Sequence, residues 1–469
     1  MLLLCAVSFV QSQFVEDALR YSSLGLGVGA RTLGLGTAYT GIAEGFSSVY
    51  WNPAGLAQSQ LSEISLGLSH LSYGNNSTFV GQQQSFTNSA TSLNSFGIVY
   101  PYPTTRGSLV FALGYGRQTD FTTGLSFNSF NPRNSIVQTW ARDNTAYPND
   151  LSDNIAYQLY LANLDTASGT FDSKILDSTT QSSTVLEGGG LNHVALSGAV
   201  EAARNLYLGI TLNFITGSYS YTRNYYEDDL KNIYNNTRFP FDFTSLSLLE
   251  TVESDVSGFA VKLGLLYKLS PDFRIGLAVK TPSYITVRET FSMEATSTFD
   301  NGDHYTYPAG GAYPSQNEYD VHSPFVFSIG SSYNIRHLMV SGDIEYTDWT
   351  QMEFANANSG LLALNTSIKK TFRPTANLRL GGEYNFEDAG FALRGGFMYL
   401  PSPYQGDPSS FGQKYITGGL GFIIDNSIGI DLGYAYGYWD TYHQVYQGVN
   451  TTVEKITTHN LLGTVSYRF

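Results

Sequence analysis

The sequence predicts an all-β protein, a 14-stranded antiparallel transmembrane β-barrel with an N-terminal plug, and three observations indicate it. Segments in which apolar and polar residues alternate with a period of two recur from about residue 61 to the last residue. Short connections between these segments alternate with long polar ones, as in bacterial outer-membrane barrels. A Gly/Ala-rich stretch, residues 24–57, lacks this alternation and carries only two charges, Arg31 and Glu44.

Composition favours a barrel over a helical membrane protein or a nucleic-acid-binding protein. The chain has 469 residues, of which 14% are aromatic and 14% are charged, and 47 are glycine. Its mean hydropathy is -0.13, and it has no run of about 18 apolar residues that could form a spanning helix. The net charge of -14 argues against nucleic acid as a partner, because phosphate binding requires a basic surface.

Residues 1–12 are predicted to be a signal peptide. The run from Met1 to Val10 is apolar and has the length of an h-region, and cleavage is expected before Gln13. No basic segment precedes it, which leaves open whether the leader is truncated. The single cysteine, Cys5, follows Leu4, a residue too large for a lipoprotein signal. The mature chain would then carry no thiol, which suits an oxidising periplasm.

The Gly/Ala-rich stretch is expected to lie in a plug, or hatch, of residues 13–60 inside the barrel. Asn52 followed by Pro53 is a good helix start, because the Asn side chain caps free N–H groups and Pro gives up an N–H that would be unpaired. The alternative is an ordinary loop-helix turn of a soluble domain. The residues assigned to the plug are Gly29, Ala30, Arg31, Trp51, Asn52, Pro53, Ala54, Gly55 and Leu56.

The barrel is expected to fill residues 61–469. In the segment near 256–269, one set of alternate residues, which includes Phe259 and Tyr267, is apolar and suits a face toward lipid. The other set includes Lys262 and suits a face toward the lumen. A soluble two-sheet sandwich would also alternate, but it gives no reason for strictly alternating loop lengths. Charges recur on the lumen-facing phase, at Lys262, Arg274, Lys280, Asp343, Glu345, Arg379, Glu383 and Arg394. The segments lie near 61–72, 93–101, 107–117, 191–201, 205–222, 256–269, 272–290, 321–334, 337–350, 371–386, 390–401, 412–424, 427–440 and 456–469.

The longest connection is expected at about 118–190 and is rich in Asn, Asp, Ser and Thr. Its apolar side chains could line an external groove or anchor the loop against the barrel, and we favour anchoring. They are Phe121, Leu125, Phe127, Phe130, Ile175, Leu176, Val185 and Leu186. In the third segment, Gly114 and Gly116 are candidates for a strand kink, because glycine permits bulges and bends.

The C-terminus is the strongest local signal. In the last nine residues, Leu461, Gly463, Val465, Tyr467 and Phe469 share one phase. A final Phe with aromatic and apolar residues at alternate positions resembles the C-terminal signature by which outer-membrane proteins are recognised for insertion. Tyr467 and Phe469 are therefore the expected insertion signal, with the barrel-assembly machinery as the partner.

Several residues carry a resemblance to a known family. Gly29-Ala30-Arg31 with Gly34 and Gly36, followed by Tyr50-Trp51-Asn52-Pro53-Ala54-Gly55-Leu56, resembles the hatch of the FadL/TodX family, the outer-membrane long-chain fatty-acid and hydrocarbon transporters. Weaker matches in strands are Asp343-Ile344-Glu345-Tyr346 and Leu393-Arg394-Gly395-Gly396-Phe397. The order of elements fits along essentially the whole mature chain.

The resemblance implies a 14-stranded barrel with a hatch that imports long-chain fatty acids or aromatic hydrocarbons by passive diffusion. In the family, the ligand passes from a groove at the loops to a pocket near the hatch and leaves sideways through a kink in an early strand. Lateral exit is physically reasonable, because moving an alkyl chain through water costs about 0.8 kcal/mol per CH₂. A PorV-like barrel acting in protein secretion or surface attachment shares the hatch features and stays as the alternative. A nonspecific solute porin is a third class of protein that the sequence could encode.

The lumen-facing charges have two interpretations. A carboxylate ligand would need an Arg or Lys to replace its hydration, but both signs occur on neighbouring segments, which favours pairing within the lumen or to the hatch. Arg31 is expected to pair with a wall carboxylate such as Asp343 or Glu383 and so to pin the hatch. The reason is that an unpaired charge inside the barrel would be costly.

The sequence shows no enzyme motif. The glycines between 25 and 36 lack Walker spacing and a following Lys-Ser/Thr, and the 7 histidines show no metal-ligand spacing. We therefore expect no catalytic residue, no cofactor and no metal. The expected partners are a hydrophobic small molecule, outer-membrane lipid with lipopolysaccharide, and the assembly machinery. The chain is expected to be a monomer in the bacterial outer membrane.

Overall fold

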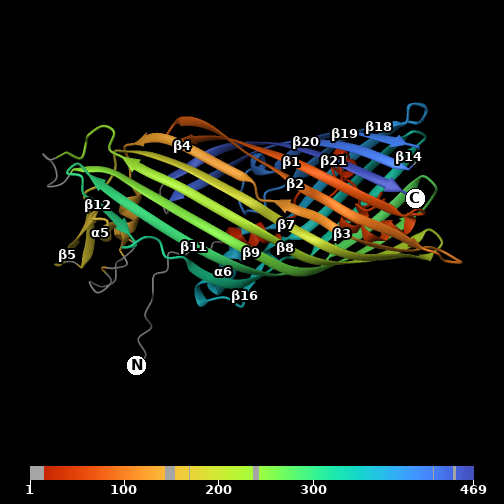
Figure 1. Cartoon of the computed structure of the whole chain (residues 1–469), viewed down its shortest axis with the longest axis horizontal. Coiled ribbons are helices and arrows are strands. Elements are labelled where there is room, and N and C mark those ends of the chain that lie inside the picture. Colours follow the sequence, from red (N-terminus) through yellow and green to blue (C-terminus); the bar gives the residue numbers. More distant parts are fainter. Residues whose placement is uncertain are drawn as a thin grey trace, which may run out of the picture.

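The structure is a computed structural model, and it describes residues 15–142, 151, 154–167, 169–235, 242–425, 427–446 and 450–469. The strands form one antiparallel sheet that closes on itself, because the first strand, β1 (Glu63–Phe79), pairs with the last, β21 (Asn450–Arg468). The long axis of this barrel is horizontal in Figure 1. The predicted leader, residues 1–12, lies outside the described residues.

Fourteen units cross the wall, and three of them are interrupted. The continuous strands are β1, β2 (Gln82–Tyr102), β7 (Thr179–Ala203), β8 (Leu206–Asp228), β9 (Phe243–Lys268), β15 (Leu338–Asp348), β17 (Pro374–Phe386), β18 (Phe391–Leu400), β19 (Gln413–Ile424), β20 (Ile428–Tyr446) and β21. The interrupted units are β3 (Leu109–Asp120) with β4 (Thr123–Asn131), β10 (Phe273–Lys280) with β11 (Tyr284–Phe299), and β13 (Ser315–His322) with β14 (Val326–Ile335). The prediction of a 14-stranded barrel is confirmed.

The other elements lie within the barrel or beyond its strands. The N-terminal part has α1 (Val15–Ser22), α2 (Ala30–Gly34), α3 (Ser48–Trp51) and the 3-10 helix η1 (Pro53–Gln58). The connections contain α4 (Ile136–Arg142), α5 (Ile155–Gln158), β5 (Ala162–Asp165), β6 (Thr170–Ser173), β12 (His304–Tyr307), η2 (Trp349–Gln351), β16 (Glu353–Ala355), α6 (Ser359–Thr371), η3 (Glu387–Ala389) and η4 (Ser409–Phe411). Among the described residues, no helix is both long enough and apolar enough to span a membrane.

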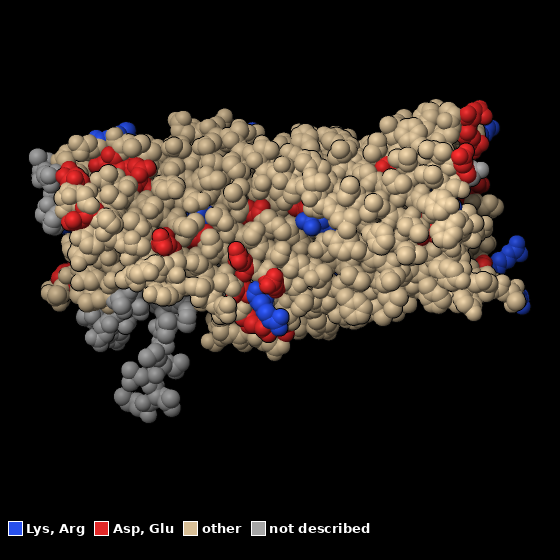
Figure 2. Space-filling view, viewed as in Figure 1, with Lys and Arg blue, Asp and Glu red and all other residues tan. Residues whose placement is uncertain are grey.

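An apolar band surrounds the end of the barrel that carries the short turns and the C-terminus. On β8 and β9 the outward residues as far as Phe214 and Phe259 are exposed and apolar, whereas Thr216, Ser257 and Asp255 beyond them are polar. Figure 2 shows the wall toward its right-hand end almost free of charge, with charged residues at both ends and near the middle. An apolar outer band is the surface that meets lipid, so the strands continue well beyond the membrane on the loop side.

The predicted segments locate every crossing unit, and several of them are too short at the loop end. β7 begins at Thr179 rather than near 191, and β9 begins at Phe243 rather than near 256. Beyond the lipid band the outer face meets water. Outward and inward residues there no longer differ clearly in polarity, so the alternation disappears from the sequence. The expected loop at about 118–190 accordingly contains β4 and half of β7. The segments near 272–290 and 321–334 each break at a proline, Pro282 and Pro324, which cannot donate a ladder hydrogen bond.

Apolar side chains fill the lumen at three levels. The hatch forms the first, where Ile42 and Trp51 pack with Leu266 of the wall. Helix α1 contributes Tyr21 to the second level. The third is the long connection between β4 and β7, which packs inside the strands beyond the lipid band, for example through Val137. Figure 1 shows the hatch, in red, toward the C-terminal end and α5 at the opposite end.

The apolar side chains of the long connection are mostly anchors. Phe121, Leu125 and Phe127 are buried, as are Ile175 and Val185. Leu176 and Leu186 are exposed, and Phe130 is half-buried beneath the ammonium group of Lys231. Leu125 and Phe127 of β4 and Val185 of β7 pack in one buried cluster with Val137 and Ile175 of the connection, as we expected of anchors.

Candidate functional site

The hatch lies inside the cylinder and is capped as its sequence predicts. Asn52 is fully buried and precedes η1, where its Oδ1 accepts a hydrogen bond from the Ala54 N–H at 3.2 Å and Pro53 takes the first helical position. The Asn52 amide also donates to the Thr40 carbonyl at 2.9 Å and to the Leu265 carbonyl of β9 at 3.1 Å. The helix start expected at Asn52 and Pro53 is confirmed, and the same side chain ties the hatch to the wall.

Trp51 is buried within the barrel next to this cap. Its indole Nε1 donates to the Val28 carbonyl at 3.0 Å, and the Arg379 guanidinium lies 5.3 Å from the centre of its ring. Ala54 and Leu56 are also fully buried. Gly55 has no space for a side chain, because a Cβ there would lie 1.9 Å from the Ala43 carbonyl oxygen. The expected plug motif is therefore packed entirely into the lumen.

Glycines of the wall allow the hatch backbone to touch the strands directly. A Cβ on Gly264 would lie 2.1 Å from Asn52 Oδ1, and one on Gly276 would lie 2.0 Å from the Thr40 carbonyl oxygen. A Cβ on Gly433 would lie 2.4 Å from the Ala30 carbonyl oxygen. Real Cβ atoms do not approach so closely, so a side chain at any of these wall positions would displace the hatch.

A chain of six alternating charges ties the hatch to the wall. The Arg31 guanidinium contacts both carboxylate oxygens of Glu383 at 2.8 Å and also Glu44 at 2.8 Å. Glu44 continues to Arg274 of β10 at 2.7 Å. On the other side Glu383 accepts from Arg394 of β18 at 2.6 Å, and Arg394 also reaches Asp431 at 2.6 Å. Of the two expected partners of Arg31, the structure places Glu383 against it.

Asp343, the other expected partner of Arg31, binds the backbone of the hatch instead of its arginine. Its Oδ2 accepts hydrogen bonds from the backbone N–H groups of Tyr39 at 2.8 Å and Thr40 at 2.7 Å. Glu345 on the same strand pairs with Arg379 of β17 through both oxygens, at 2.7 and 3.1 Å. Six of the eight predicted lumen charges therefore bind one another or the hatch through ion pairs or, for Asp343, through backbone N–H groups.

Glu44 makes the hatch attachment sensitive to acid. Burial works against the ionisation of Glu44, but the guanidinium groups of Arg31 and Arg274 outweigh it and lower the pKa of this carboxyl from 4.5 to about 2. Since the folded-state pKa is depressed, the stabilisation is complete above about pH 4.5 and is lost as the pH falls toward 2.

We expect the small-ion conductance of the protein in planar bilayers to stay low between about pH 7 and pH 5 and to rise as the pH falls below about 4.5. In Glu44→Gln the hatch should already leak at neutral pH, because Arg31 and Arg274 both lose the charged carboxylate of Glu44. A Glu44→Gln variant that conducts like the wild type at neutral pH would show that this carboxylate does not hold the hatch.

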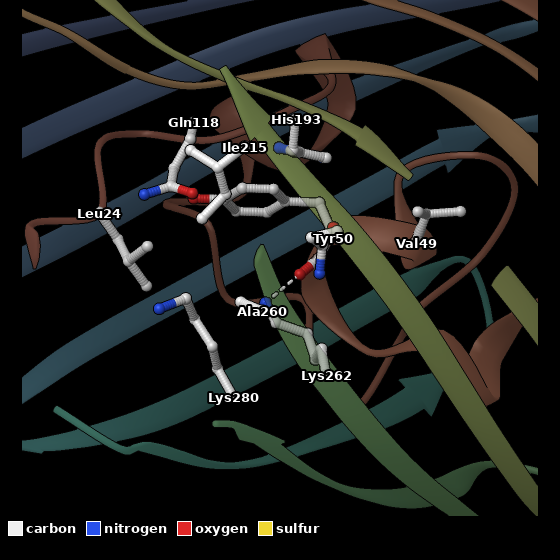
Figure 3. A pocket seen from close by; sticks show the side chains of 10 residues that line it. Leu24, Val49, Tyr50, Gln118, His193, Ile215, Ala260, Lys262 and Lys280 are labelled. Atoms are coloured by element: carbon white, nitrogen blue, oxygen red, sulfur yellow. Dashed lines mark hydrogen bonds between the residues drawn. The ribbon is translucent and has the colours of Figure 1, made fainter. Parts of the chain in front are cut away.

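A narrow cavity lies directly against the hatch. The hatch contributes three residues to the lining, Leu24, Val49 and Tyr50. The wall contributes the others, which are Gln118, His193, Asn213, Ile215, Ala260, Lys262 and Lys280. Figure 3 shows the Tyr50 ring in the centre, with Gln118 and His193 on one side and Lys262 and Lys280 on the other. The cavity abuts Val49 and Tyr50, just before the Asn-Pro-Ala motif.

Among the described residues, Lys262 and Lys280 are the two predicted lumen cations that form no ion pair. The Lys262 ammonium donates to the Tyr50 carbonyl and lies 4.8 Å from the centre of the Tyr50 ring. The Lys280 ammonium is bound by the hydroxyls of Ser283 at 2.7 Å and Ser323 at 3.3 Å. Among the described residues neither forms an ion pair with a carboxylate. Two lysines thus face a cavity whose described lining contains no acidic side chain.

The kink candidates Gly114 and Gly116 lie in the paired part of β3, opposite Gly97 and Ser95 of β2. A Cβ on Gly114 would lie 2.4 Å from the Phe46 ring, and one on Gly97 would lie 2.0 Å from the same ring. These two glycines therefore form a socket for Phe46. Gly116 is the last β3 residue paired with β2, and the β3–β7 register shifts directly after Arg117.

Tyr467 and Phe469 are exposed on the outer surface, and their rings stack with centroids 5.5 Å apart. The Phe469 backbone exchanges hydrogen bonds at 3.0 Å with Ser62, just before β1. The aromatic end of the chain is therefore presented outside the barrel, beside the seam where the first and last strands meet.

Sequence analysis missed the residues that connect the hatch to β2 and β3. These are Phe46, Asn94 and Gln118, together with the cavity residue His193, whose ring stacks on that of Tyr50 with centroids 5.4 Å apart. Asn94 and Gln118 look like ordinary polar positions in their segments. The β1–β2 register skips Asn94 and the β3–β7 register skips Gln118, and the resulting shift in the alternation is concealed by polar neighbours.

The closed barrel agrees with what comparison with other proteins finds. No curated protein sequence matches the chain. Solved structures with the same fold include the toluene transporter TodX of P. putida, with a TM-score of 0.58 and 14% identity over 95% of this chain and 99% of that one. A FadL homologue of Pseudomonas aeruginosa gives 0.55 and 14% over 95% and 99%. The CymD monoaromatic hydrocarbon channel gives 0.51 and 15% over 95% and 99%.

The sequence also matches a family model over residues 29–468, which is nearly the whole described chain. The model describes an outer membrane protein transport protein, OMPP1/FadL/TodX. It is a transport family and not an enzyme family, and the secretion alternative gains no support from it or from the similar structures. The chain therefore belongs to the OMPP1/FadL/TodX family of outer membrane transport proteins.

Proposed function

We propose that this protein imports a hydrophobic small molecule that carries a carboxylate, and that the molecule binds in the cavity beside the hatch. The observation that carries the proposal is the pair of lysines, Lys262 and Lys280, that face this cavity without a charged partner. TodX and CymD are described as carriers of toluene and monoaromatic hydrocarbons. A neutral hydrocarbon accepts no hydrogen bond from an ammonium group, whereas a carboxylate would gain charge-assisted hydrogen bonds.

The physical argument is one of desolvation. An ammonium group removed from water is costly unless an opposite charge or good acceptors replace its hydration. Lys280 has two neutral hydroxyl partners, and Lys262 has one carbonyl oxygen and an aromatic face. The Tyr50 hydroxyl is buried and has no hydrogen-bond partner among the described residues. A carboxylate in the cavity would supply acceptors for all three groups, while Ile215 and Leu24 offer apolar contact to its alkyl chain.

We expect Lys280→Met and Lys262→Met to weaken binding of a fatty acid about tenfold to a hundredfold, because a hydrogen bond to a charged group contributes about 1.5–3 kcal/mol and 1.4 kcal/mol is tenfold. Titration calorimetry with oleate, compared with oleyl alcohol, measures this. Lys369→Met on α6 is the matched control, because Lys369 is exposed and does not line the cavity. Equal affinity of the wild type for acid and alcohol would overturn the assignment of a carboxylate.

We propose the remaining partners from the outer surface of the barrel. Outer-membrane lipid and lipopolysaccharide contact the apolar band and the polar strands beyond it. The barrel-assembly machinery recognises the exposed Tyr467 and Phe469 at the seam. The ligand leaves sideways into the membrane beside β3, near Gly116, and the protein acts as a monomer with a hatch of residues 13–60.

A further inference from the structure

We propose that the preferred ligand of this protein is a fatty acid that carries a hydroxyl group close to its carboxylate, and that Asn213 and His193 bind this hydroxyl. The inference rests on the proposed function, because it concerns the cavity beside the hatch and the anion site of Lys262 and Lys280. A neutral hydrogen-bonding site lies next to these two lysines, and it narrows the class of molecule that the cavity selects.

Four polar side chains of the cavity lie on an oblique line across adjacent strands of the wall. Lys280 of β10 is directly opposite Lys262 of β9. Asn213 of β8 is a diagonal neighbour of Lys262, two residues out of register, and His193 of β7 is a diagonal neighbour of Asn213 in the same way. Diagonal neighbours in an antiparallel sheet are about 7–8 Å apart. The line therefore has two cations at one end and two neutral polar groups at the other.

The Tyr50 ring of the hatch contacts both ends of this line. The Lys262 ammonium lies 4.8 Å from the centre of the ring, and the His193 ring stacks on it with centroids 5.4 Å apart. Figure 3 shows the Tyr50 ring between His193 and Lys262. A small polar head group beside Tyr50 can thus reach the lysines and the neutral groups together.

The two neutral groups have hydrogen-bonding capacity that the protein does not use. Within the described part of the chain, the Asn213 amide and the His193 imidazole form no hydrogen bond. His193 is nevertheless buried, with 3% of the residue exposed. A buried polar group without a hydrogen bond is destabilising, and most such groups in proteins are satisfied. Their position in the cavity lining indicates a ligand that supplies the missing partners.

A hydroxyl group matches these partners better than a second carboxylate does. The Asn213 amide and a neutral imidazole each offer a donor and an acceptor, and a hydroxyl both donates and accepts, whereas a carboxylate only accepts. Because Asn213 is a near neighbour of Lys262, the hydroxyl must lie within a few bonds of the carboxylate. Leu24 and Ile215 are left as apolar contacts for the alkyl chain.

Titration calorimetry of the wild-type protein with ligands of one chain length tests this. We expect 3-hydroxydodecanoate to bind about tenfold tighter than dodecanoate, because two neutral hydrogen bonds of ordinary strength change affinity by about that factor. 12-Hydroxydodecanoate should bind no tighter than dodecanoate, because its hydroxyl is at the far end of the chain. Equal affinity for 3-hydroxydodecanoate and dodecanoate, or an equal gain for both hydroxy acids, would overturn the inference.

The ratio of the affinities for 3-hydroxydodecanoate and dodecanoate should fall to about threefold or less in Asn213→Leu and in His193→Phe, which keeps an aromatic ring against Tyr50. Because both affinities are measured in the same variant, a general change in packing cancels in this ratio. If either variant keeps the wild-type ratio, that residue does not recognise the hydroxyl and the assignment is wrong.

Asn460→Leu is the matched control. Asn460 of β21 lies between the buried Thr458 and Leu462 on the lumen side of its strand and is half-buried like Asn213, but it does not line the cavity. It should keep the wild-type ratio. A ratio that falls as far in Asn460→Leu as in Asn213→Leu would show that the preference does not arise in the cavity, and it would overturn the inference.

Two alcohols separate this inference from the proposed function. 1-Dodecanol and dodecane-1,3-diol lack a carboxylate, and the diol carries its second hydroxyl where 3-hydroxydodecanoate does. If dodecanoate binds no tighter than 1-dodecanol, but the diol binds about tenfold tighter than 1-dodecanol and Asn213→Leu removes that gain, the carboxylate proposal fails and the hydroxyl site stands. If dodecanoate binds tighter than 1-dodecanol and the added hydroxyl gains nothing, the carboxylate proposal stands and the hydroxyl site fails.

Discussion

Arg31→Ala is expected to convert the barrel from a closed to a leaking channel. Arg31 makes three hydrogen bonds, two to Glu383 and one to Glu44. Removing one partner of a buried, hydrogen-bonded charge pair costs about 2–5 kcal/mol. Even about 2 kcal/mol would raise the fraction of unlatched hatch roughly 30-fold, since 1.4 kcal/mol is tenfold. Small-ion conductance in planar bilayers measures the change.

The matched control is Arg288→Ala. Arg288 lies exposed on the outer wall and pairs with Glu318 alone at 2.7 Å, and such exposed pairs contribute little. Conductance should therefore stay at the wild-type level in this variant. If Arg31→Ala conducts no more than Arg288→Ala, the ionic chain does not hold the hatch.

Phe46→Ala is expected to release the hatch from the side of β2 and β3. The Phe46 ring fills the socket left by Gly97 and Gly114, and it is buried, with 4% of the residue exposed. Loss of a buried phenylalanine costs about 3–5 kcal/mol, because the transfer energy is lost and a cavity remains. This corresponds to opening of the hatch at least about 100-fold more often.

Trypsin cleavage after Arg31 reports such opening, because proteolysis follows the population of the open form when reclosing is fast. We expect cleavage at least about 100-fold faster than in the wild type. Phe325→Ala is the control, since Phe325 is exposed to lipid on the outer face and touches nothing in the hatch. Equal cleavage rates in the two variants would show that the socket does not retain the hatch.

The barrel could be predicted wherever its two faces meet different surroundings. On β9, Leu263 and Tyr267 face lipid while Lys262 and Leu266 face the lumen. The different surroundings of the two faces produce the alternation with a period of two. Beyond Phe259 the outer face meets water and Asp255 replaces an apolar residue, so the strand continues without a signal. The alternation resumes after Pro282 and after Pro324, so the strand breaks at these prolines cannot be recognised from the pattern.

The site was predictable in its charges but not in its geometry. Arg31 stood out as a lone cation in an uncharged stretch, which indicated a partner on the wall. The choice between Asp343 and Glu383 depends on which strand faces α2, and no local pattern encodes that. The separation of Lys262 and Lys280 from the paired charges likewise depends on distances across the lumen.

The contacts that hold the hatch join the beginning of the chain to its end. The Ala30 N–H donates to Thr464 Oγ1, and the Glu63 carboxylate accepts from both Phe46 and Arg468. Contacts so distant in sequence give the fold a high contact order, which slows folding because long loops must close before such contacts form. The hatch therefore cannot complete these contacts before β21 is synthesised, so the sealing of the barrel is a late step of biogenesis.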